Sequence, residues 1–593
     1  MNGIGGMLVH TTGKPASWEK MLEQLKKRGP GEHGYFIAPR VCLVHTGHTV
    51  NPNTPQPLRG TFGLRVYVLV CDGELYNKEA IQKELRALGY RMGENSDAAI
   101  ILQSYMAWGK GCLDKLNGAY AFAVYDGEGL FIARDRLGLK PLFYTSGDFG
   151  FLFASSVPAL LCHPDAKSQL DAEGIADLML IGPGRTPGCG VLKGIHELKP
   201  GHYLTHRFDA TPQVHPYWQL KAKPHNEDFD ETITTLRKLL GSAVEQQAAP
   251  GVLLSGGLDS SLMATLSKSK QTFSLDFMGN EKYFTADAFM PETDGPFIKE
   301  MVKHLHTQHH HFTMGTDDLA EMLLPAMEAR GLPGMGDIDA SLLFLCKNIR
   351  AHVPAALTGE GADELFGGYP WYTEETLREA ETFPWSLTLQ HRLSFLREGV
   401  LGTLNPEEYV RTRFLETCQS APALYDDEPI DRSVRQQFVL NLYWFLQNLT
   451  ARMETMATAA GLTLRAPFLD YRLVEYAYNI PWHMKFHQDR EKGLLREAFK
   501  KNLPNKIVNR KKSPFPKTHN PAFLRKMQDM ITELLALPNA PLFQFIDAKA
   551  LKTILQENPE HRWYGQLMAL PQTFAYFLQM NAWLTNNSID IVE

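Results

Sequence analysis

The sequence predicts two domains of different fold class, an α+β domain followed by an α/β domain with a parallel sheet. Strand-like runs separated by Asp/Gly turns dominate roughly the first 210 residues. From residue 228 onward, isolated apolar strands alternate with long stretches of helical periodicity, which is typical of a parallel sheet. A polar, proline-bearing segment separates the two parts. We therefore expect domains over residues 1–210 and 228–593, joined by a linker at 211–227.

The α+β assignment of the first domain comes from individual elements. Strands are expected at 64–70, 119–124, 130–133 and 150–154. Helical periodicity interrupts them at 78–88 and 98–108. Neither a repeat nor a low-complexity tract is visible, so each domain is expected to fold around its own core.

Composition excludes several classes of protein. The hydrophobic content of 44% and charged content of 21% are those of a globular protein. No basic N-terminal region and no apolar run approaching about 18 residues is visible, so we expect a cytoplasmic protein without a membrane partner. The seven cysteines include no C-x-x-C pair, which argues against a zinc site or a disulfide framework. A net charge of −6 gives no electrostatic footprint for nucleic acid.

A phosphate-binding loop is predicted where an apolar run ends. Residues 251–261 read Gly-Val-Leu-Leu-Ser-Gly-Gly-Leu-Asp-Ser-Ser and lead into a helix-compatible stretch. Gly256 and Gly257 permit a tight turn with converging N–H groups, and the following helix adds the positive end of its dipole. Asp259 cannot approach a polyphosphate without a cation, which implies Mg²⁺. Hydroxyl donors are expected from Ser255, Ser260 and Ser261. The G-x-x-x-x-G-K-[ST] pattern is absent, and S-G-G-x-D-S resembles the loop of ATP pyrophosphatases instead.

A second loop supplies further carboxylates. It begins at Thr358-Gly359-Glu360, continues through Asp363 and ends in Phe-Gly-Gly-Tyr. Asp363 together with Asp259 could bind Mg²⁺ against pyrophosphate oxygens, while Glu360 remains for proton transfer or for an incoming amine. Lys512, in a basic triplet, is the cation expected at the α-phosphorus and the departing pyrophosphate.

These motifs resemble, in chain order, those of glutamine-dependent asparagine synthetases. The C-terminal set comprises S-G-G-L-D-S-S, T-G-E-G-A-D-E-L-F-G-G-Y, R-A-P-F-L-D at 465–470, K-G-L-L-R at 492–496 and R-K-K at 510–512. The N-terminal set comprises R-G-P at 28–30, Q-P-L at 56–58, G-E-L-Y-N at 73–77, S-D at 96–97 and R-D-R-L-G-L-K-P-L at 134–142. The resemblance implies an Ntn-hydrolase-like αββα sandwich followed by an α/β PP-loop domain of the adenine nucleotide alpha-hydrolase-like type.

The same resemblance implies an activity and a set of site residues. Aspartate and ATP would form β-aspartyl-AMP and pyrophosphate, and ammonia would convert the intermediate to asparagine and AMP. Leu253 and Leu275 match positions that hold adenine. The positions matching the nucleotide, metal and intermediate site are Ser255, Gly257, Asp259, Ser260, Gly359, Glu360, Asp363 and Lys512.

The glutaminase half departs from the family at three positions. Asn2 stands where the family has its N-terminal cysteine nucleophile, and a carboxamide cannot replace a thiolate. Gly47 replaces an Arg that would clamp the substrate carboxylate. Asp72 replaces an Asn that would stabilise the oxyanion, and a lost donor costs about 10²–10³ in rate. Gly73 and Asp97 keep family positions, which fold maintenance alone can explain. We expect a degenerate glutaminase, with ammonia or another amine as the nitrogen source.

The sequence also leaves other functions open. Thr463 stands where the family has a Glu two residues before the R-x-P-F-L-D element, which allows a different carboxylate or amine. β-Lactam-forming enzymes and lasso-peptide cyclases resemble this family and also have defective N-terminal domains. A third hypothesis is a regulatory subunit that binds ATP without turnover. A homodimer and a separate ammonia source are further expectations.

Overall fold

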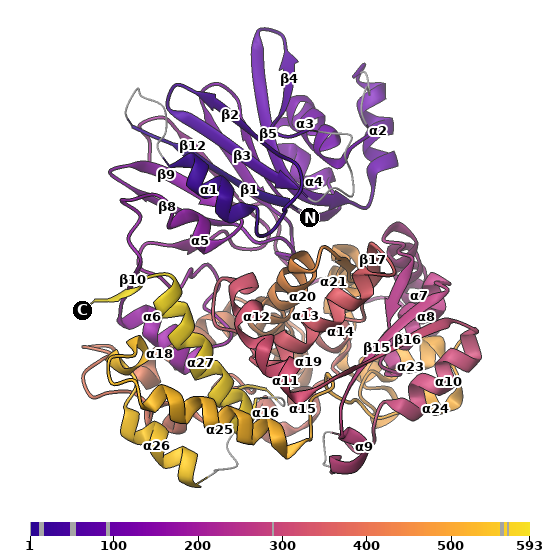
Figure 1. The fold of residues 1–593 in the computed structure, drawn as a ribbon. Coiled ribbons are helices and arrows are strands. Elements are labelled where there is room, and N and C mark those ends of the chain that lie inside the picture. Colours follow the sequence, from indigo (N-terminus) through magenta and orange to yellow (C-terminus); the bar gives the residue numbers. More distant parts are fainter. Residues whose placement is uncertain are drawn as a thin grey trace. The chain divides into compact units, whose positions relative to one another are not determined.

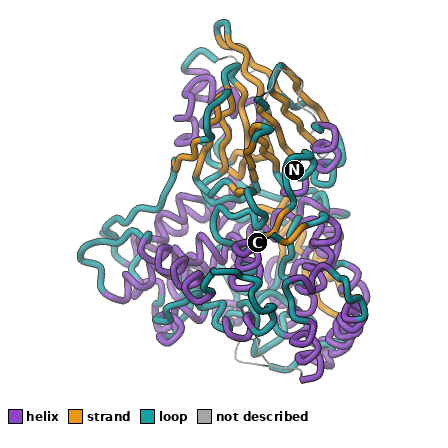
Figure 2. Tube along the Cα trace, turned by 90° about the vertical axis from the view of Figure 1, so that its left-hand side faces the viewer, coloured by secondary structure: helices purple, strands orange, loops and turns teal. Residues whose placement is uncertain are grey.

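The chain folds into two compact units. The structure is a computed structural model that describes residues 2–10, 17–47, 55–90, 95–286, 290–557, 562–565 and 568–592. Unit 1 comprises Met1–Gln169 and Pro187–Gln219, and unit 2 comprises Leu170–Thr186 and Leu220–Glu593. Strands dominate unit 1 and helices dominate unit 2 (Figures 1 and 2). In the part of the chain that the structure describes, no helix combines the length and the apolar character that crossing a membrane requires.

Unit 1 contains two six-stranded antiparallel sheets. The first has the order β11-β8-β9-β1-β3-β2 and the second β13-β12-β7-β6-β5-β4. The first sheet is formed by β1 (Asn2–Leu8), β2 (His33–Ala38), β3 (Val41–Gly47), β8 (Phe143–Gly147), β9 (Gly150–Ala154) and β11 (His196–Glu197). The second sheet is formed by β4 (Leu58–Phe62), β5 (Arg65–Leu75), β6 (Gly118–Tyr125), β7 (Gly129–Arg134), β12 (His202–Arg207) and β13 (Gln213–Pro216).

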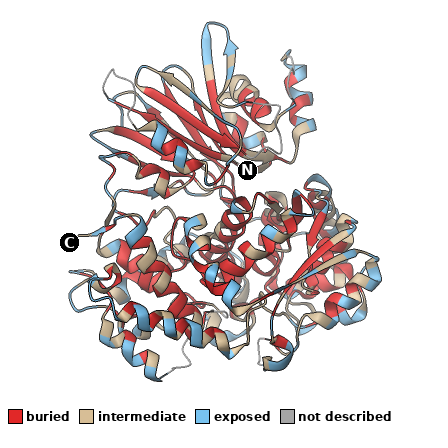
Figure 3. Ribbon diagram, viewed as in Figure 1, coloured by how far each residue is buried: buried red, intermediate tan, exposed pale blue. Residues whose placement is uncertain are grey.

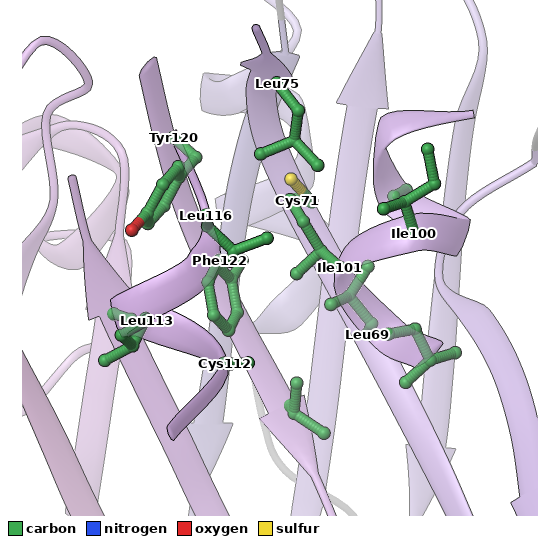
Figure 4. Packing of buried hydrophobic residues seen from close by; sticks show 14 of the residues in the cluster. Leu69, Cys71, Leu75, Ile100, Ile101, Cys112, Leu113, Leu116, Tyr120 and Phe122 are labelled. Carbon is green, nitrogen blue, oxygen red and sulfur yellow. The ribbon is translucent and has the colours of Figure 1, made fainter. Parts of the chain in front are cut away.

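The side-chain alternation of β5 explains how this unit builds two cores. Val68 and Val70 belong to the core shared with β1, β3 and β9 of the first sheet. Leu69 and Cys71 point to the other face, because successive residues of a strand alternate. There they pack against the helices α2 (Lys78–Ala87), α3 (Asp97–Trp108) and α4 (Cys112–Lys115). Figure 4 shows the residues of α3 and α4 in this cluster. The buried strands of unit 1 stand out in Figure 3.

Two further helices contact the first sheet. Helix α1 (Trp18–Leu25) buries its apolar side against β1 and β3, and α5 (Val157–Leu160) contacts β8 and β9. The result is an αββα sandwich. It confirms the predicted architecture of the first domain.

Unit 2 is built on a five-stranded parallel sheet. The strand order is β16-β15-β14-β17-β18, with β14 (Gly251–Leu253), β15 (Gln271–Phe277), β16 (Gln308–Met314), β17 (Ala355–Leu357) and β18 (Thr463–Arg465). Helix α8 (Leu258–Ser267) contacts β14 and packs with α7 (Phe229–Gln246) and α10 (Gly295–Leu305). Helix α13 (Asp337–Arg350) contacts β15 and β16 and packs with α20 (Leu446–Ala459), which contacts β18. The predicted α/β class with a parallel sheet is confirmed.

The remaining helices of unit 2 surround this sheet and extend from it. They are α6 (Ala172–Ala176), α9 (Asn280–Tyr283), α11 (Thr316–Glu321), α12 (Leu323–Arg330), α14 (Ala362–Phe366), α15 (Pro370–Thr373), α16 (Glu375–Arg378), α17 (Leu389–Leu393), α18 (Pro406–Gln419), α19 (Pro429–Leu440), α21 (Tyr471–Asn479), α22 (Trp482–Lys485), α23 (Gly493–Phe499), α24 (Asn505–Val508), α25 (Pro521–Leu535), α26 (Ala548–Glu557) and α27 (Leu570–Asn586).

The boundary between the units is more complex than one linker. Residues 170–186, expected in the first domain, cluster with unit 2. The reason is tertiary, since Arg392 Nη1 donates to the Leu180 carbonyl at 2.9 Å and Tyr409 donates to Asp177 at 2.9 Å. The expected linker at 211–227 contains β13, which pairs with β12. The composition of these segments does not reveal which distant residues they contact.

Asp337, the first residue of α13, provides a test of the contact between α13 and α27. Its Oδ2 accepts a hydrogen bond from Gln572 Nε2 of α27 at 2.9 Å. Burial raises the pKa of Asp337 from 3.8 to about 7, although Gln572 and Lys517 act in the opposite direction. The folded state therefore holds this proton more tightly than the unfolded state, so its stabilising contribution is lost as pH rises from about 4 through about 7.

The isosteric Asp337→Asn variant should remove that pH dependence. Between pH 5 and pH 8, we expect the melting temperature of the wild type to fall by roughly 2–5 °C more than that of the variant. Thermal melts followed by circular dichroism at both pH values provide the measurement. Equal falls in the two proteins would show that Asp337 is ionised in the fold at both pH values.

Candidate functional site

One cavity of unit 2 lies where strands of the parallel sheet end. It encloses about 210 Å³ that water can occupy. Leu253 ends β14, Leu275 lies in β15 and Thr358 directly follows β17, and all three line the cavity. Ligands of open α/β sheets bind at the carboxyl ends of the strands, so this is the expected location of a binding site.

The cavity collects nearly all the residues predicted in the C-terminal half. The predicted residues that line it are Leu253, Ser255, Gly257, Asp259, Ser260, Leu275, Thr358, Gly359, Glu360, Asp363 and Lys512. Gly256 instead turns the loop, because its φ is 71° and a Cβ at this position would lie 2.6 Å from Phe297 Cβ. The two loops and the basic triplet therefore form one site.

The first loop presents donors to this cavity. Ser255 Oγ and Ser260 Oγ lie 3.1 Å apart. The N-cap residue of α8 is Gly257, which has no side chain to accept from the backbone. The amides of the first turn are therefore left for another acceptor. Arg510, for which the sequence indicated no role beyond membership of the basic triplet, supports the loop. Its Nη1 donates to the Ser255 carbonyl at 2.9 Å, and its Nη2 pairs with Asp294 at 2.5 Å. This arrangement suits a phosphate group.

The two predicted metal ligands share their surroundings with two lysines. Lys492 Nζ lies 2.6 Å from Asp259 Oδ2 and 2.5 Å from Asp363 Oδ1, and Lys512 Nζ lies 2.5 Å from Asp363 Oδ2. Against the effect of burial, these lysines lower the pKa of Asp363 to about 2. Burial, together with repulsion from Asp363, raises the pKa of Asp259 despite its contact with Lys492.

The carboxylates fit a divalent cation that also binds phosphate. Asp259 Oδ1 is buried and has no hydrogen-bond partner among the described residues. Those residues also form no group of three or more His, Cys, Asp or Glu side chains that could hold a metal by themselves. Mg²⁺ usually binds through one or two carboxylates with substrate phosphates completing its shell. Asp259 and Asp363 match that pattern.

Glu360 faces an arginine that sequence reasoning missed. Arg452, in α20, donates from Nη2 to Glu360 Oε1 at 2.8 Å, and its guanidinium lies over the Phe515 ring at 5.1 Å. Its Nε and Nη1 are buried with no partner in the described part of the chain. Buried guanidinium donors of this kind are suited to a carboxylate. No motif marks Arg452, because it lies inside a helix 92 positions from Glu360.

A second set of predicted residues comes together in unit 1. Asn2 pairs with Gly47 across the β1–β3 ladder, and its backbone N–H donates to Asp72 Oδ1 at 3.1 Å. Lys140 Nζ lies 3.2 Å and Arg28 Nη2 3.5 Å from the Asp72 carboxylate, which is 1% exposed. Although burial would raise the pKa of Asp72, these cations lower it. A buried negative charge thus stands beside Asn2.

Asp97 already has partners for both of its oxygens. Leu75 N–H donates to Oδ1 at 2.7 Å, and Lys78 Nζ donates to Oδ2 at 2.9 Å. Ser96 caps α3 by accepting from Ala99 N–H, as a Ser-Asp helix start predicts. Gly73 lies within β5 opposite Tyr120. The partners of Asp97 were not visible in the sequence, because Lys78 shows no motif.

Comparisons with known proteins identify both halves. Residues 235–585 match the family model described as asparagine synthase, and residues 1–218 match the glutamine amidotransferase domain. The chain is similar to asparagine synthetase [glutamine-hydrolyzing] 3 of Bacillus subtilis strain 168, with 39% identity over 97% of this chain and 96% of the relative. It is also similar to asparagine synthetase [glutamine-hydrolyzing] 1 of the same organism, with 27% identity over 86% of each chain.

Proposed function

This chain belongs to the asparagine synthase family and is an ATP-dependent ligase, and on that premise we propose that it makes asparagine from aspartate, ATP and ammonia. AMP and pyrophosphate are the other products. The observation that carries the proposal is the single cavity in which the S-G-G-L-D-S-S loop, the Asp259 and Asp363 carboxylates, Lys512 and the Glu360–Arg452 pair meet.

The residues of the cavity suit carboxylate adenylation. We assign the adenine to the apolar end near Leu253 and Leu275, and the phosphates to the α8 amides with Ser255 and Ser260. A carboxylate oxygen attacks the α-phosphorus, and the bond to pyrophosphate breaks. Asp259 and Asp363 would hold Mg²⁺, which supplies positive charge against the pyrophosphate oxygens.

The amide-forming step would take place beside Arg452. Its Nε and Nη1, for which the described part of the chain offers no partner, suit the α-carboxylate of aspartate. Glu360 is placed to accept a proton as ammonia attacks the activated carbonyl and AMP departs. We assign no substrate contact to Thr463, since its neighbour Leu464 lines the cavity and successive strand residues face opposite sides.

Two features of unit 1 support ammonia as the nitrogen source. Asn2 is no nucleophile, and the buried charge of Asp72 would repel the oxyanion of an amide hydrolysis intermediate. Asp97, at the position that the family uses for the glutamine amine, accepts from Leu75 and Lys78, which is in keeping with the fold-maintaining role expected of it. Cys71 adjoins Asp72, but burial raises the pKa of its thiol well above the usual value, so the thiolate is scarce. Free ammonia or a separate ammonia-releasing enzyme would then supply nitrogen.

The product formed from each nitrogen source tests the proposal. With aspartate, ATP and Mg²⁺, we expect asparagine from ammonium chloride, and at least about 10³-fold less from glutamine at equal concentration. Mass spectrometry of asparagine and a glutamate assay provide the readouts. The ammonia-dependent rate should rise with pH, because NH₃ and not NH₄⁺ is the nucleophile.

The same assay separates the alternatives. Glutamate release from glutamine in step with asparagine formation would contradict the loss of glutaminase activity. Pyrophosphate release with another carboxylate, but not with aspartate, would favour a ligase of different substrate. If no carboxylate stimulates pyrophosphate exchange, the result would favour a regulatory subunit that binds ATP without turnover. The Asp259→Asn variant serves as the control that ties any product to this cavity.

A further inference from the structure

The ammonium group of Lys492 lies between the two carboxylates assigned to the metal. It contacts Asp259 Oδ2 at 2.6 Å and Asp363 Oδ1 at 2.5 Å, and its side chain is 2% exposed. Lys512 contacts the other oxygen of Asp363 and is 24% exposed. Lys492 is thus a buried cation that bridges two acids lying 104 positions apart in the sequence.

The backbone of Lys492 has a conformation that is unusual for a residue with a side chain. Its backbone has φ 55° and ψ 29°, the left-handed region that residues with a Cβ enter at a cost of about 1–2 kcal/mol. Gly368 leaves the necessary room, since a Cβ at this position would lie 1.9 Å from Asp363 Oδ1 and 2.4 Å from Lys492 Cε. Such strain persists where the surrounding structure over-determines it, often at functional sites.

The charges of this cluster restrict what can bind to it. Asp259, Asp363, Lys492 and Lys512 sum to zero when all are ionised. A divalent cation that approaches both carboxylates must compete with the Lys492 ammonium and leaves an excess of two positive charges in a buried site. A polyphosphate that arrives with the cation offsets that excess.

We propose that Lys492 is a positioning residue that holds Asp259 and Asp363 together and suppresses the binding of a free divalent cation, so that the cation binds only with the nucleotide. This inference rests on the proposed function of the cavity. It makes metal and nucleotide mutually dependent, and such a coupling changes each affinity by the same factor. Futile occupation of the site by the metal alone is thereby avoided.

Mn²⁺ binding measured without turnover tests this role. In the wild type we expect weak Mn²⁺ binding alone and strong binding with a non-hydrolysable ATP analogue, by electron paramagnetic resonance or calorimetry. Lys492→Met should tighten the binding of Mn²⁺ alone by at least about fivefold and reduce the enhancement by the analogue. Lys501→Met, at an exposed position, is the matched control and should leave both affinities unchanged.

A stability cycle separates this charge role from simple packing. Lys492→Met should lower the melting temperature, because two buried carboxylates lose their shared cation. Adding Asp259→Asn should restore part of that loss if repulsion is its cause, and should not if Lys492 only fills space. Should Lys492→Met fail to fold, the double variant still permits the comparison with Asp259→Asn alone.

The outcomes distinguish two kinds of failure. If Mn²⁺ with the analogue does not bind to the wild type, the proposed nucleotide site is wrong. If it binds, but Lys492→Met leaves the affinity for Mn²⁺ alone unchanged or weaker, the proposed site stands and the role of Lys492 is overturned.

Discussion

Replacing Lys512 by Met is expected to slow aspartate-dependent pyrophosphate release by about 10²- to 10³-fold. Burial acts to lower the pKa of Lys512, but the Asp363 and Asp259 carboxylates raise it above its usual value. The side chain is therefore a permanent cation and not a base. In a site rich in oxygens, we expect it to stabilise the negative charge that develops on the α-phosphoryl group and on the departing pyrophosphate.

The kinetic pattern of Lys512→Met distinguishes this role from ground-state binding. We expect kcat to carry most of the loss and the KM for ATP to change less, because the interaction strengthens in the transition state. Lys501→Met removes an exposed ammonium in the same region of the sequence and should retain wild-type kinetics. A Lys512→Met enzyme with unchanged kcat would mean that another group supplies the charge.

Replacing Arg452 by Lys is expected to raise the KM for aspartate by about 30-fold or more. An ammonium cannot reproduce the planar fork, so it would serve Glu360 or the substrate carboxylate, but not both in the observed geometry. The two nitrogens of Arg452 that have no partner among the described residues are the ones we assign to the substrate carboxylate. Losing one partner of a buried, hydrogen-bonded charge pair costs about 2–5 kcal/mol.

Separate titrations of the two substrates provide the measurement for Arg452→Lys. The affinity for an ATP analogue in the absence of aspartate should change little, since the nucleotide is assigned to the opposite loop. Arg411→Lys is the matched control: Arg411 pairs with Glu381 on the surface, and the two side chains are 61% and 72% exposed. A rise in the KM for ATP of the same size would indicate that Arg452 supports the whole cavity and does not bind aspartate.

Local sequence patterns were sufficient for much of the fold. The runs at 119–124 and 130–133 became β6 and β7, each extended by one residue at either end, and 78–88 became α2. As predicted, the S-G-G-L-D-S-S motif follows a strand and leads into a helix: its S-G-G turn comes after β14, and its L-D-S-S residues begin α8. These features depend on side-chain periodicity and on turn chemistry, which neighbouring residues determine among themselves. The identities of Asn2, Gly47 and Asp72, on which the expected loss of glutaminase activity depends, can be read from the sequence in the same way.

Only the tertiary structure decided which charges meet. Lys492 reaches Asp259 across 233 positions, Arg452 reaches Glu360 across 92, and Lys78 reaches Asp97 across 19. Residues 170–186 likewise joined unit 2 through contacts with Arg392 and Tyr409. No periodicity encodes such pairs, since they follow from strand order and from the packing of helices against the sheet. The sequence by itself therefore determined which reactive side chains this protein carries, while the fold determined which of them meet and how their charges are balanced.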